Sequence, residues 1–217
     1  IEMTVHHGDA AVMQQTVERA AVPTAVVFPG QGCQQRGMGM QTYARSAAAQ
    51  AIWDRADAHC RAKHGWSILE VVRTNPRQMR ARDVNGVLQR VQHPKGVLHL
   101  TQFTQVALCT LAVAGVAELE ERGVLPADPY IAGHSVGEYS ALAALTGVLP
   151  LEGVIDVVYA RGQTMQHFVP RDAQGRSPYA MSVIRPHKAG LAAADVEAVV
   201  ADAARALGKP AYVVNYN

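Results

Sequence analysis

The sequence has little of what nucleic-acid-binding and disulfide-linked proteins use. Its formal net charge is only +2 at pH 7, and aromatic residues make up 6% of its 217 positions. It therefore offers neither a strongly basic patch nor a stacking platform for bases. Its three cysteines, Cys33, Cys60 and Cys109, lie far apart, and no two form a Cys-x-x-Cys pair. We expect no nucleic-acid partner and a reducing, cytoplasmic location.

Signals for targeting and membrane insertion are also missing. The first seven residues, IEMTVHH, have neither the basic start nor the apolar core of a signal peptide. The longest apolar run, about 106–117, is too short to cross a bilayer, so we expect no membrane partner. The chain lacks an initiator methionine and stops at Asn217 without a capping signal, which leads us to expect a section of a longer polypeptide.

A glycine-rich loop at 29–32 follows an apolar run but lacks the residues of a nucleotide-binding loop. Gly32 and Gly37 have the spacing of a P-loop, yet Met38 stands where the phosphate-binding lysine is required. Gly30 and Gly32 lack the third glycine of a dinucleotide-binding motif, since Gln35 occupies that position. We therefore expect the loop to bring backbone N–H groups to a reacting oxygen instead.

Two other clusters give weak signals. His59, Cys60 and His64 are close in sequence, but adjacent residues on a helix point in different directions. We therefore expect no metal site there. The stretch 73–82 contains four arginines, which favours a solvated face over a docking patch for an acidic partner.

The strongest local pattern is Gly-x-Ser-x-Gly at 133–137. A short apolar run precedes it at 130–132, and an alanine-rich, helix-forming stretch follows it. This order of strand, sharp turn and helix predicts a nucleophile elbow, with Ser135 exposed at the tip. The N–H of Val136 would then point at an oxyanion, assisted by the helix dipole. The alternative is an ordinary tight turn.

The remaining patterns predict a globular α/β chain, in keeping with 49% hydrophobic and 18% charged residues. Thr24–Phe28 is typical of a buried parallel strand. Helices are predicted over 46–63, 101–122 and 151–169, and a short helical or extended piece over 67–72. In the first helix we expect these residues to point inward: Ala47, Ile52, Ala56 and Cys60.

The two ends of the chain differ from this central part. Weak alternation over 1–22 predicts a strand or two, followed by a linker. Near the other end, alternation over 179–183 predicts a strand, 191–207 an amphipathic helix and 211–214 another strand. This strand–helix–strand order indicates the opening of a second, smaller α+β unit.

Several motifs together resemble one family. FPGQG at 28–32, QFTQ at 102–105, GHSVGEYSAL at 133–142, YARG at 159–162 and VVNYN at 213–217 have the order and spacing of acyl-CoA:acyl-carrier-protein acyltransferases. More narrowly, PTAVVFPGQG, IWDRAD and RDAQGRSPYAM are similar to the malonyl/palmitoyl transferase domain of a type I fatty acid synthase.

This resemblance implies a fold and a domain division. Residues 23–178 would form an α/β-hydrolase-like acyltransferase core, with a parallel sheet flanked by helices. Residues 179–217 would be the first, incomplete part of a ferredoxin-like α+β subdomain. Residues 1–22 would be the tail of a preceding, dehydratase-side region and a linker.

The resemblance also implies residue roles. Ser135 would be the nucleophile, and the backbone N–H groups of Gln31 and Val136 would form the oxyanion hole. Arg161 would hold the free carboxylate of malonyl, a task suited to a planar, permanently charged fork. Taken alone, it would be assigned to the surface. The resemblance further places two substrate-binding residues near the site: Gln105, which alone would also be assigned to the surface, and His134.

The implied reaction moves malonyl from CoA to acyl carrier protein, and long acyl chains such as palmitoyl back to CoA, through an acyl-serine. A CoA thioester and the phosphopantetheine arm of the carrier would be substrates, with no tightly bound cofactor and no metal. The other synthase domains, in a large homo-oligomer, would be partners. The alternatives are a serine esterase or thioesterase, a stand-alone or polyketide-synthase acyltransferase, and a scaffold section without activity.

One element of the family pattern is missing from these 217 residues. A serine nucleophile needs a base, which in this family is a histidine downstream of VVNYN. Only His167 and His187 follow Ser135, and both precede that motif. We therefore expect the catalytic histidine to lie beyond Asn217.

Overall fold

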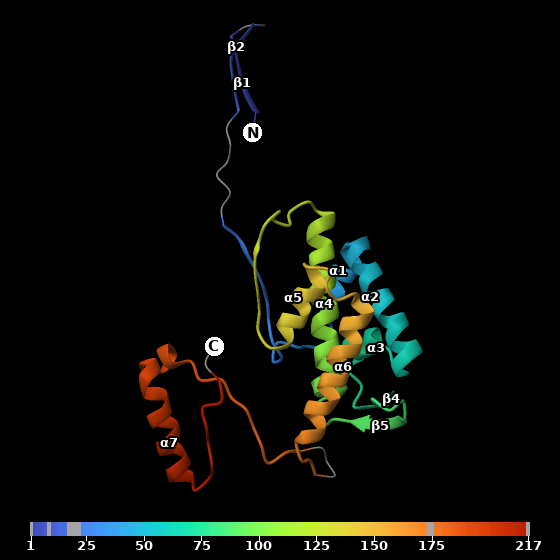
Figure 1. Cartoon of the computed structure of the whole chain (residues 1–217), viewed down its shortest axis with the longest axis vertical. Helices are drawn as coiled ribbons and strands as arrows, with labels where there is room; N and C mark the ends of the chain where they lie inside the picture. The colour runs from blue at the N-terminus through green and yellow to red at the C-terminus, as the bar shows by residue number, and fades with distance from the viewer. Residues whose placement is uncertain (1, 8–9, 17–22, 173–175, 216–217) are drawn as a thin grey trace. The chain divides into compact units, whose positions relative to one another are not determined.

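A computed structural model describes residues 2–7, 10–16, 23–172 and 176–215 (Figure 1). The chain divides into two compact units, Ile1–Ser177 and Pro178–Asn217. At the start of the first unit, strands β1 (Glu2–His7) and β2 (Ala10–Thr16) pair antiparallel, with a register shift between Val5 and His6. The predicted strands at this end are confirmed. The predicted linker falls mostly on residues 17–22, which lie outside the described residues.

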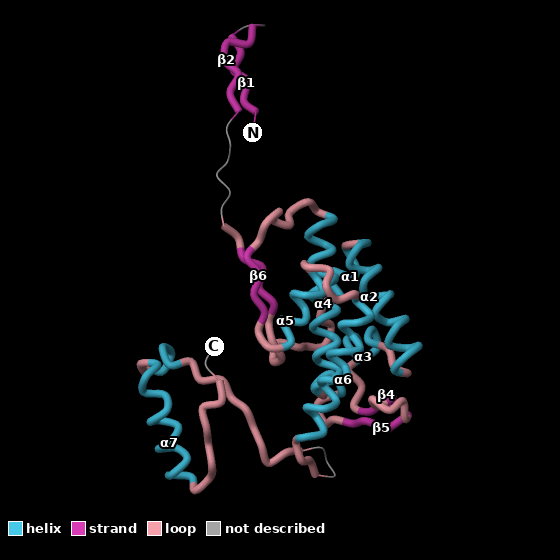
Figure 2. Tube along the Cα trace, viewed as in Figure 1, coloured by secondary structure: helices cyan, strands magenta, loops and turns pink. Residues whose placement is uncertain are grey.

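A parallel pair of strands carries the two functional loops. Strand β3 (Ala25–Phe28) lies beside β6 (Tyr130–Gly133), in register from Ala25 opposite Tyr130 to Phe28 opposite Gly133 (Figure 2). Because the strands are parallel, the loops that leave Phe28 and Gly133 emerge at the same edge. Both predicted strands are confirmed, and so is the α/β fold class.

The predicted burial of β3 is wrong for most of its residues. Phe28 packs in a small core with Val116 and Ala141, which come from helices α4 (Thr101–Glu121) and α5 (Val136–Ala144). By contrast, Val27 is 68% exposed and Tyr130 of β6 is 71% exposed. A buried parallel strand needs cover on both faces, whereas in the described residues the helices cover one face of the pair, the face that carries Val26 and Phe28.

Helix α4 is the centre of the helical layer (Figure 1). It packs against α2 (Ala47–His59), α5 and α6 (Leu151–Phe168). Its 21 residues and a mean hydropathy of 1.3 over 18 of them are sufficient for a membrane span, but 67% of that window is buried within the protein. It is therefore a core helix. The predicted end is confirmed, since Arg122 caps the helix and Gly123 takes a positive φ of 65°.

The helix predicted over 46–63 is present as α2 and the π-helical turn that continues it, whereas α1 (Met40–Arg45) was not predicted. After α1, the Ser46 hydroxyl accepts a 3.0 Å hydrogen bond from the Ala49 N–H and so caps α2. Ala56 and Cys60 are buried and Ile52 is partly buried, as predicted. Ala47 is exposed, because the buried stripe runs through a different set of positions: Ala49, Trp53, Ala56 and Cys60.

A π-helical turn, η1 (Cys60–His64), continues α2. It is followed by α3 (Ile68–Thr74), whose N-terminus is capped by the hydroxyl of Ser67, and later by the 3₁₀ turn η2 (Val97–His99). These segments complete the core of the first unit.

A hairpin of β4 (Gln78–Arg82) and β5 (Leu88–Gln92) was not predicted. Part of the arginine-rich stretch 73–82 therefore forms a strand. The Asp83 carboxylate accepts hydrogen bonds from the Asn85 and Val87 N–H groups, and Gly86 has a φ of 79°. The Asn85-Gly86 pair was the available turn signal.

The second unit contains η3 (Pro186–Ala189), η4 (Ala193–Asp195) and helix α7 (Val196–Leu207). The predicted helix is confirmed, although its first turn is 3₁₀. The strands predicted at 179–183 and 211–214 are wrong: both segments are loops (Figure 2). Alternation selects a face, but a strand also needs a hydrogen-bonded neighbour, and no described strand pairs with either segment. Met181 is accordingly 85% exposed.

Candidate active site

Ser135 occupies a strained turn between β6 and α5. Its φ of 55° and ψ of −111° are unusual for a residue with a Cβ. The flanking glycines make the turn possible. A Cβ on Gly137 would lie 2.1 Å from the carbonyl oxygen of Phe28, and one on Gly133 would lie 2.4 Å from the backbone of the helix that follows. The geometry is therefore that of the predicted nucleophile elbow.

The glycine-rich loop after β3 lies against the elbow. The His134 N–H donates a 3.0 Å hydrogen bond to the Phe28 carbonyl, and a Cβ on Gly30 would collide with the His134 ring, at 2.4 Å from Nδ1. Gln31 follows at the exposed tip of this loop. Val136 is the first residue of α5, so its N–H has no carbonyl partner within the helix. The arrangement suits an oxyanion hole built from these two loops.

Arg161 reaches the elbow from α6. Its Nη2 donates a 3.1 Å hydrogen bond to the Ser135 hydroxyl oxygen. Its guanidinium carbon lies 5.5 Å from the ring centroid of Tyr139, which stands one helical turn beyond Ser135. Sequence reasoning alone assigned Arg161 to the surface and did not single out Tyr139. The available signal for Tyr139 was its position four residues after the serine on the predicted helix.

Gln105 is buried, contrary to what its polarity alone suggested. It is 1% exposed, and its Nε2 donates to the sulfur of Met165 at 3.4 Å. Its Oε1 has no hydrogen-bond partner among the described residues. The side chain thus packs between α4 and α6. Helix α6 also carries Arg161, which lies four residues before Met165. Sequence reasoning did not single out Met165.

The buried cysteine that contacts α5 is chemically quiet. Cys109 on α4 is buried, with its sulfur 3.2 Å from the Ser140 hydroxyl oxygen. Burial raises the pKa of this thiol to about 11, so at neutral pH it is protonated and weakly nucleophilic. Cys109 is therefore a poor candidate for a nucleophile, whereas the hydroxyl of Ser135 belongs to an exposed residue.

The position of Arg161 depends on a close approach of α4 and α6 at the next residue. A Cβ on Gly162 would lie 2.4 Å from Cα of Gln102 and 2.6 Å from its backbone nitrogen. Nearby, the Thr101 hydroxyl donates a 3.0 Å hydrogen bond to Oε1 of Gln166. Because backbone atoms cannot move aside as a flexible side chain can, a larger residue at 162 must push the two helices apart.

Gly162→Ala is therefore expected to destabilise the fold, although alanine favours helices. Overpacking costs about 1–3 kcal/mol, which exceeds the gain of up to about 1 kcal/mol from helix propensity. Urea unfolding measures the change. The matched control is Gly115→Ala on α4, where an added Cβ meets nothing within 4 Å, so a stabilisation of up to about 1 kcal/mol is expected. Equal effects at the two positions would contradict the close approach.

The two histidines that follow Ser135 in the sequence lie on different units of the chain. His167 is exposed on α6, as predicted, and His187 belongs to the second unit, within η3. The hydrogen bond that reaches the Ser135 hydroxyl comes from Arg161.

Comparison with known proteins agrees with this geometry. Residues 25–206 match the acyl transferase domain family. The chain is 37% identical over 99% of its length to the fatty acid synthase subunit beta of Saccharomyces cerevisiae, of which it spans 12%. It resembles the acyl-carrier-protein S-malonyltransferase structure from Burkholderia pseudomallei at a TM-score of 0.56 and 27% identity, covering 85% of this chain and 49% of that one.

A second solved structure is a malonyl transacylase in complex with its type II polyketide synthase acyl carrier protein. This match has a TM-score of 0.54 and 30% identity, and it covers 69% of this chain and 41% of that one. The family match covers the elbow, the glycine-rich loop and Arg161 together. The chain therefore belongs to the acyl transferase domain family, with relatives among fungal fatty acid synthase beta subunits.

Proposed function

We propose that this chain transfers malonyl from CoA to an acyl carrier protein, and long acyl chains such as palmitoyl back to CoA, through an ester on Ser135. The Ser135 oxygen attacks the thioester carbonyl, the new C–O bond forms, and the C–S bond breaks to release CoA as a thiolate. The serine proton passes to a general base. The phosphopantetheine thiol of the carrier then takes the acyl group by the reverse sequence.

The observation that carries this proposal is the 3.1 Å hydrogen bond between Arg161 and the Ser135 hydroxyl oxygen. The free carboxylate of malonyl lies two carbon atoms from the carbonyl under attack, so a cation beside the serine is within its reach. A guanidinium can form two parallel hydrogen bonds with one carboxylate. A cation in this place therefore favours an acyl group that carries a carboxylate.

The remaining site residues have supporting roles in this proposal. The N–H groups of Gln31 and Val136 stabilise the oxyanion, each contributing a few kcal/mol in the transition state. His134 fixes the glycine-rich loop against the elbow through Gly30, and Gln105 lines the acyl site beside α6. The general base is a histidine outside these 217 residues, since neither His167 nor His187 has the family setting.

The proposal also covers the wider context. The similarity to fatty acid synthase beta subunits supports partnership with other synthase domains. A cytoplasmic location and a large homo-oligomer remain parts of the proposal. The proposed acyl transfer needs no tightly bound cofactor. Residues 23–178 are proposed as the acyltransferase core, 179–217 as the first part of a ferredoxin-like subdomain, and 1–22 as the tail of a preceding region.

Hydrolysis is the main competing function, because the elbow alone also suits an esterase or thioesterase. The native full-length polypeptide should be incubated with malonyl-CoA, with and without acyl carrier protein. We expect CoA release in large excess of the enzyme only when the carrier is present, with malonyl recovered on its thiol. Release of free malonate at the same rate without carrier would contradict transfer.

A further inference from the structure

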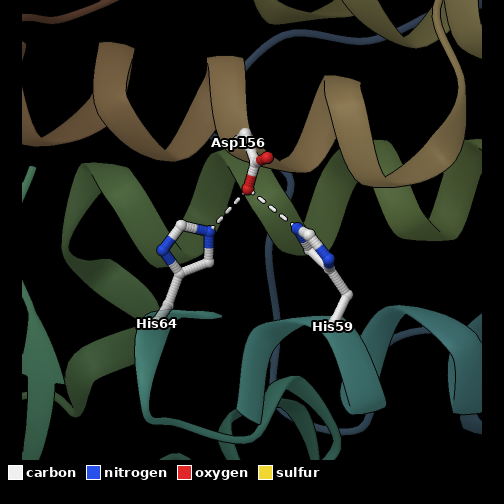
Figure 3. Close-up of side chains that lie close together, drawn as sticks. All are labelled: His59, His64 and Asp156. Atoms are coloured by element: carbon white, nitrogen blue, oxygen red, sulfur yellow. Dashed lines mark hydrogen bonds and ion pairs between the residues drawn. The ribbon is translucent and has the colours of Figure 1, made fainter. Parts of the chain in front are cut away.

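A cluster of two imidazoles and one carboxylate lies outside the acyl-transfer site. Nε2 of His59 is 2.8 Å and Nε2 of His64 is 2.9 Å from the same oxygen, Oδ1 of Asp156 (Figure 3). The three possible ligand atoms all lie within 4.8 Å of one another. Figure 3 shows both rings reaching from one turn of chain toward a carboxylate on the facing helix. We propose that His59, His64 and Asp156 form a zinc site that ties the end of α2 to α6.

The π-helical turn η1 creates this arrangement. In a regular α-helix, residues five apart lie about 140° from each other around the axis, so His59 and His64 would face different sides. Here the Gly65 N–H bonds to the Cys60 carbonyl, an i→i+5 step that widens the turn. We excluded a metal at His59, Cys60 and His64 because adjacent helical residues diverge, and that argument does not cover His59 and His64, which the π-helical turn brings together. Such π-helical turns are frequent at functional sites.

The donor set fits zinc in number and type. Two imidazole nitrogens and one carboxylate oxygen leave a fourth position for water, which is the usual composition of an open zinc site. Tetrahedral zinc holds such atoms about 3.3 Å apart. Each imidazole nitrogen would need to recede from Oδ1 by about half an ångström, and the two nitrogens, which lie within 4.8 Å of each other, would need to adopt the same spacing. The Asp156 side chain is 27% exposed and that of His59 is 19% exposed, which gives an ion a route in from solvent.

The surroundings orient the ligands. The ring of His64 packs 4.4 Å from the ring of Tyr159, one turn along α6 from Asp156. The ammonium of Lys63 bonds to the other carboxylate oxygen, Oδ2, at 2.6 Å, which leaves Oδ1 directed at the two imidazoles. Partners of this kind fix the orientation of metal ligands. Arg161, the residue proposed to hold the malonyl carboxylate, lies five residues beyond Asp156 on α6. Zinc would therefore hold in place the helix that carries Arg161.

The competing explanation is a metal-free clamp, in which both imidazoles donate hydrogen bonds to Oδ1. Zinc titration of the native full-length polypeptide, without an affinity tag, separates the two explanations. The readouts are competition with a chromophoric chelator for Zn²⁺ and the visible absorption of Co²⁺ as a tetrahedral probe. We expect Asp156→Asn and His59→Gln each to weaken Zn²⁺ binding by more than about 100-fold, because loss of an outer partner alone costs 10- to 100-fold.

The matched control is His93→Gln, which removes one ring of a different histidine pair, stacked 5.6 Å apart with His99. Its zinc affinity should equal that of the wild type. Circular dichroism checks that each variant folds. If Asp156→Asn does not fold, His59→Gln still tests the site, because His59 is the more exposed of the two imidazoles. Two results would overturn the proposal: a wild-type protein that binds zinc no more tightly than Asp156→Asn and His59→Gln do, or a loss of zinc affinity in His93→Gln equal to the loss in those variants.

Discussion

Ser135→Ala is expected to abolish covalent labelling of the native polypeptide by radiolabelled malonyl-CoA. Ser135 stands at a positive φ at the start of α5, with its hydroxyl exposed at the strand edge. Once the hydroxyl is gone, no acyl ester can form and the two-step route is closed. Loss of a serine nucleophile lowers turnover by about four to six orders of magnitude in well-studied hydrolases. Intact-mass analysis after brief exposure to the donor measures the added malonyl directly.

The matched control for this change is Ser140→Ala, five residues further along the same helix. The Ser140 hydroxyl is buried and bonds to the Val136 carbonyl at 3.3 Å, so it cannot meet a thioester. Labelling should survive in this variant. Because Ser135→Ala removes one exposed oxygen and relieves no packing, its unfolding midpoint should match that of the wild type. Undiminished acyl mass on a folded Ser135→Ala protein would refute the assignment of the nucleophile.

The parts of the site that the sequence predicted are those set by local chemistry. The two glycines flanking His134, Ser135 and Val136 are required within a single turn, where a Cβ would meet backbone at 2.1–2.4 Å. Five consecutive residues of the sequence, 133–137, are therefore enough to predict the turn. The strand before and the helix after are likewise short-range patterns, and both appear at the predicted places.

Long-range packing was not predictable in the same way. The burial of Gln105 depends on the approach of α6 from sixty residues away, and its amide gives no sign of that neighbour. The π-helical turn after His59 depends on one displaced backbone hydrogen bond, and the pattern of apolar residues in the sequence does not indicate such a bond. The strand expected at 179–183 failed for a related reason, since alternation cannot supply a pairing partner. Only the family resemblance identified Arg161, because an isolated arginine on a helix is ordinarily solvated.

The proposed role of Arg161 predicts a difference between acyl groups. Arg161→Ala is expected to lower malonyl loading by about 100- to 1,000-fold, the effect of removing one partner of a desolvated charge pair. Loading of palmitoyl should change far less, because that chain has no carboxylate for the guanidinium to hold. Burst-phase acylation with each CoA ester measures the two rates on the same protein preparation.

Arg161→Lys discriminates between charge and geometry. Lysine keeps the positive charge but loses the planar fork and its stacking over Tyr139, so malonyl loading should recover only partly. Full recovery would show that charge alone suffices, whereas equal losses of malonyl and palmitoyl loading in Arg161→Ala would exclude a carboxylate clamp. In the absence of substrate the guanidinium already bonds to the nucleophile. Because a guanidinium carries five N–H donors and the bond to Ser135 uses Nη2, the other nitrogens can take the proposed carboxylate while Nη2 stays beside the serine, which would place the thioester carbonyl next to the nucleophile.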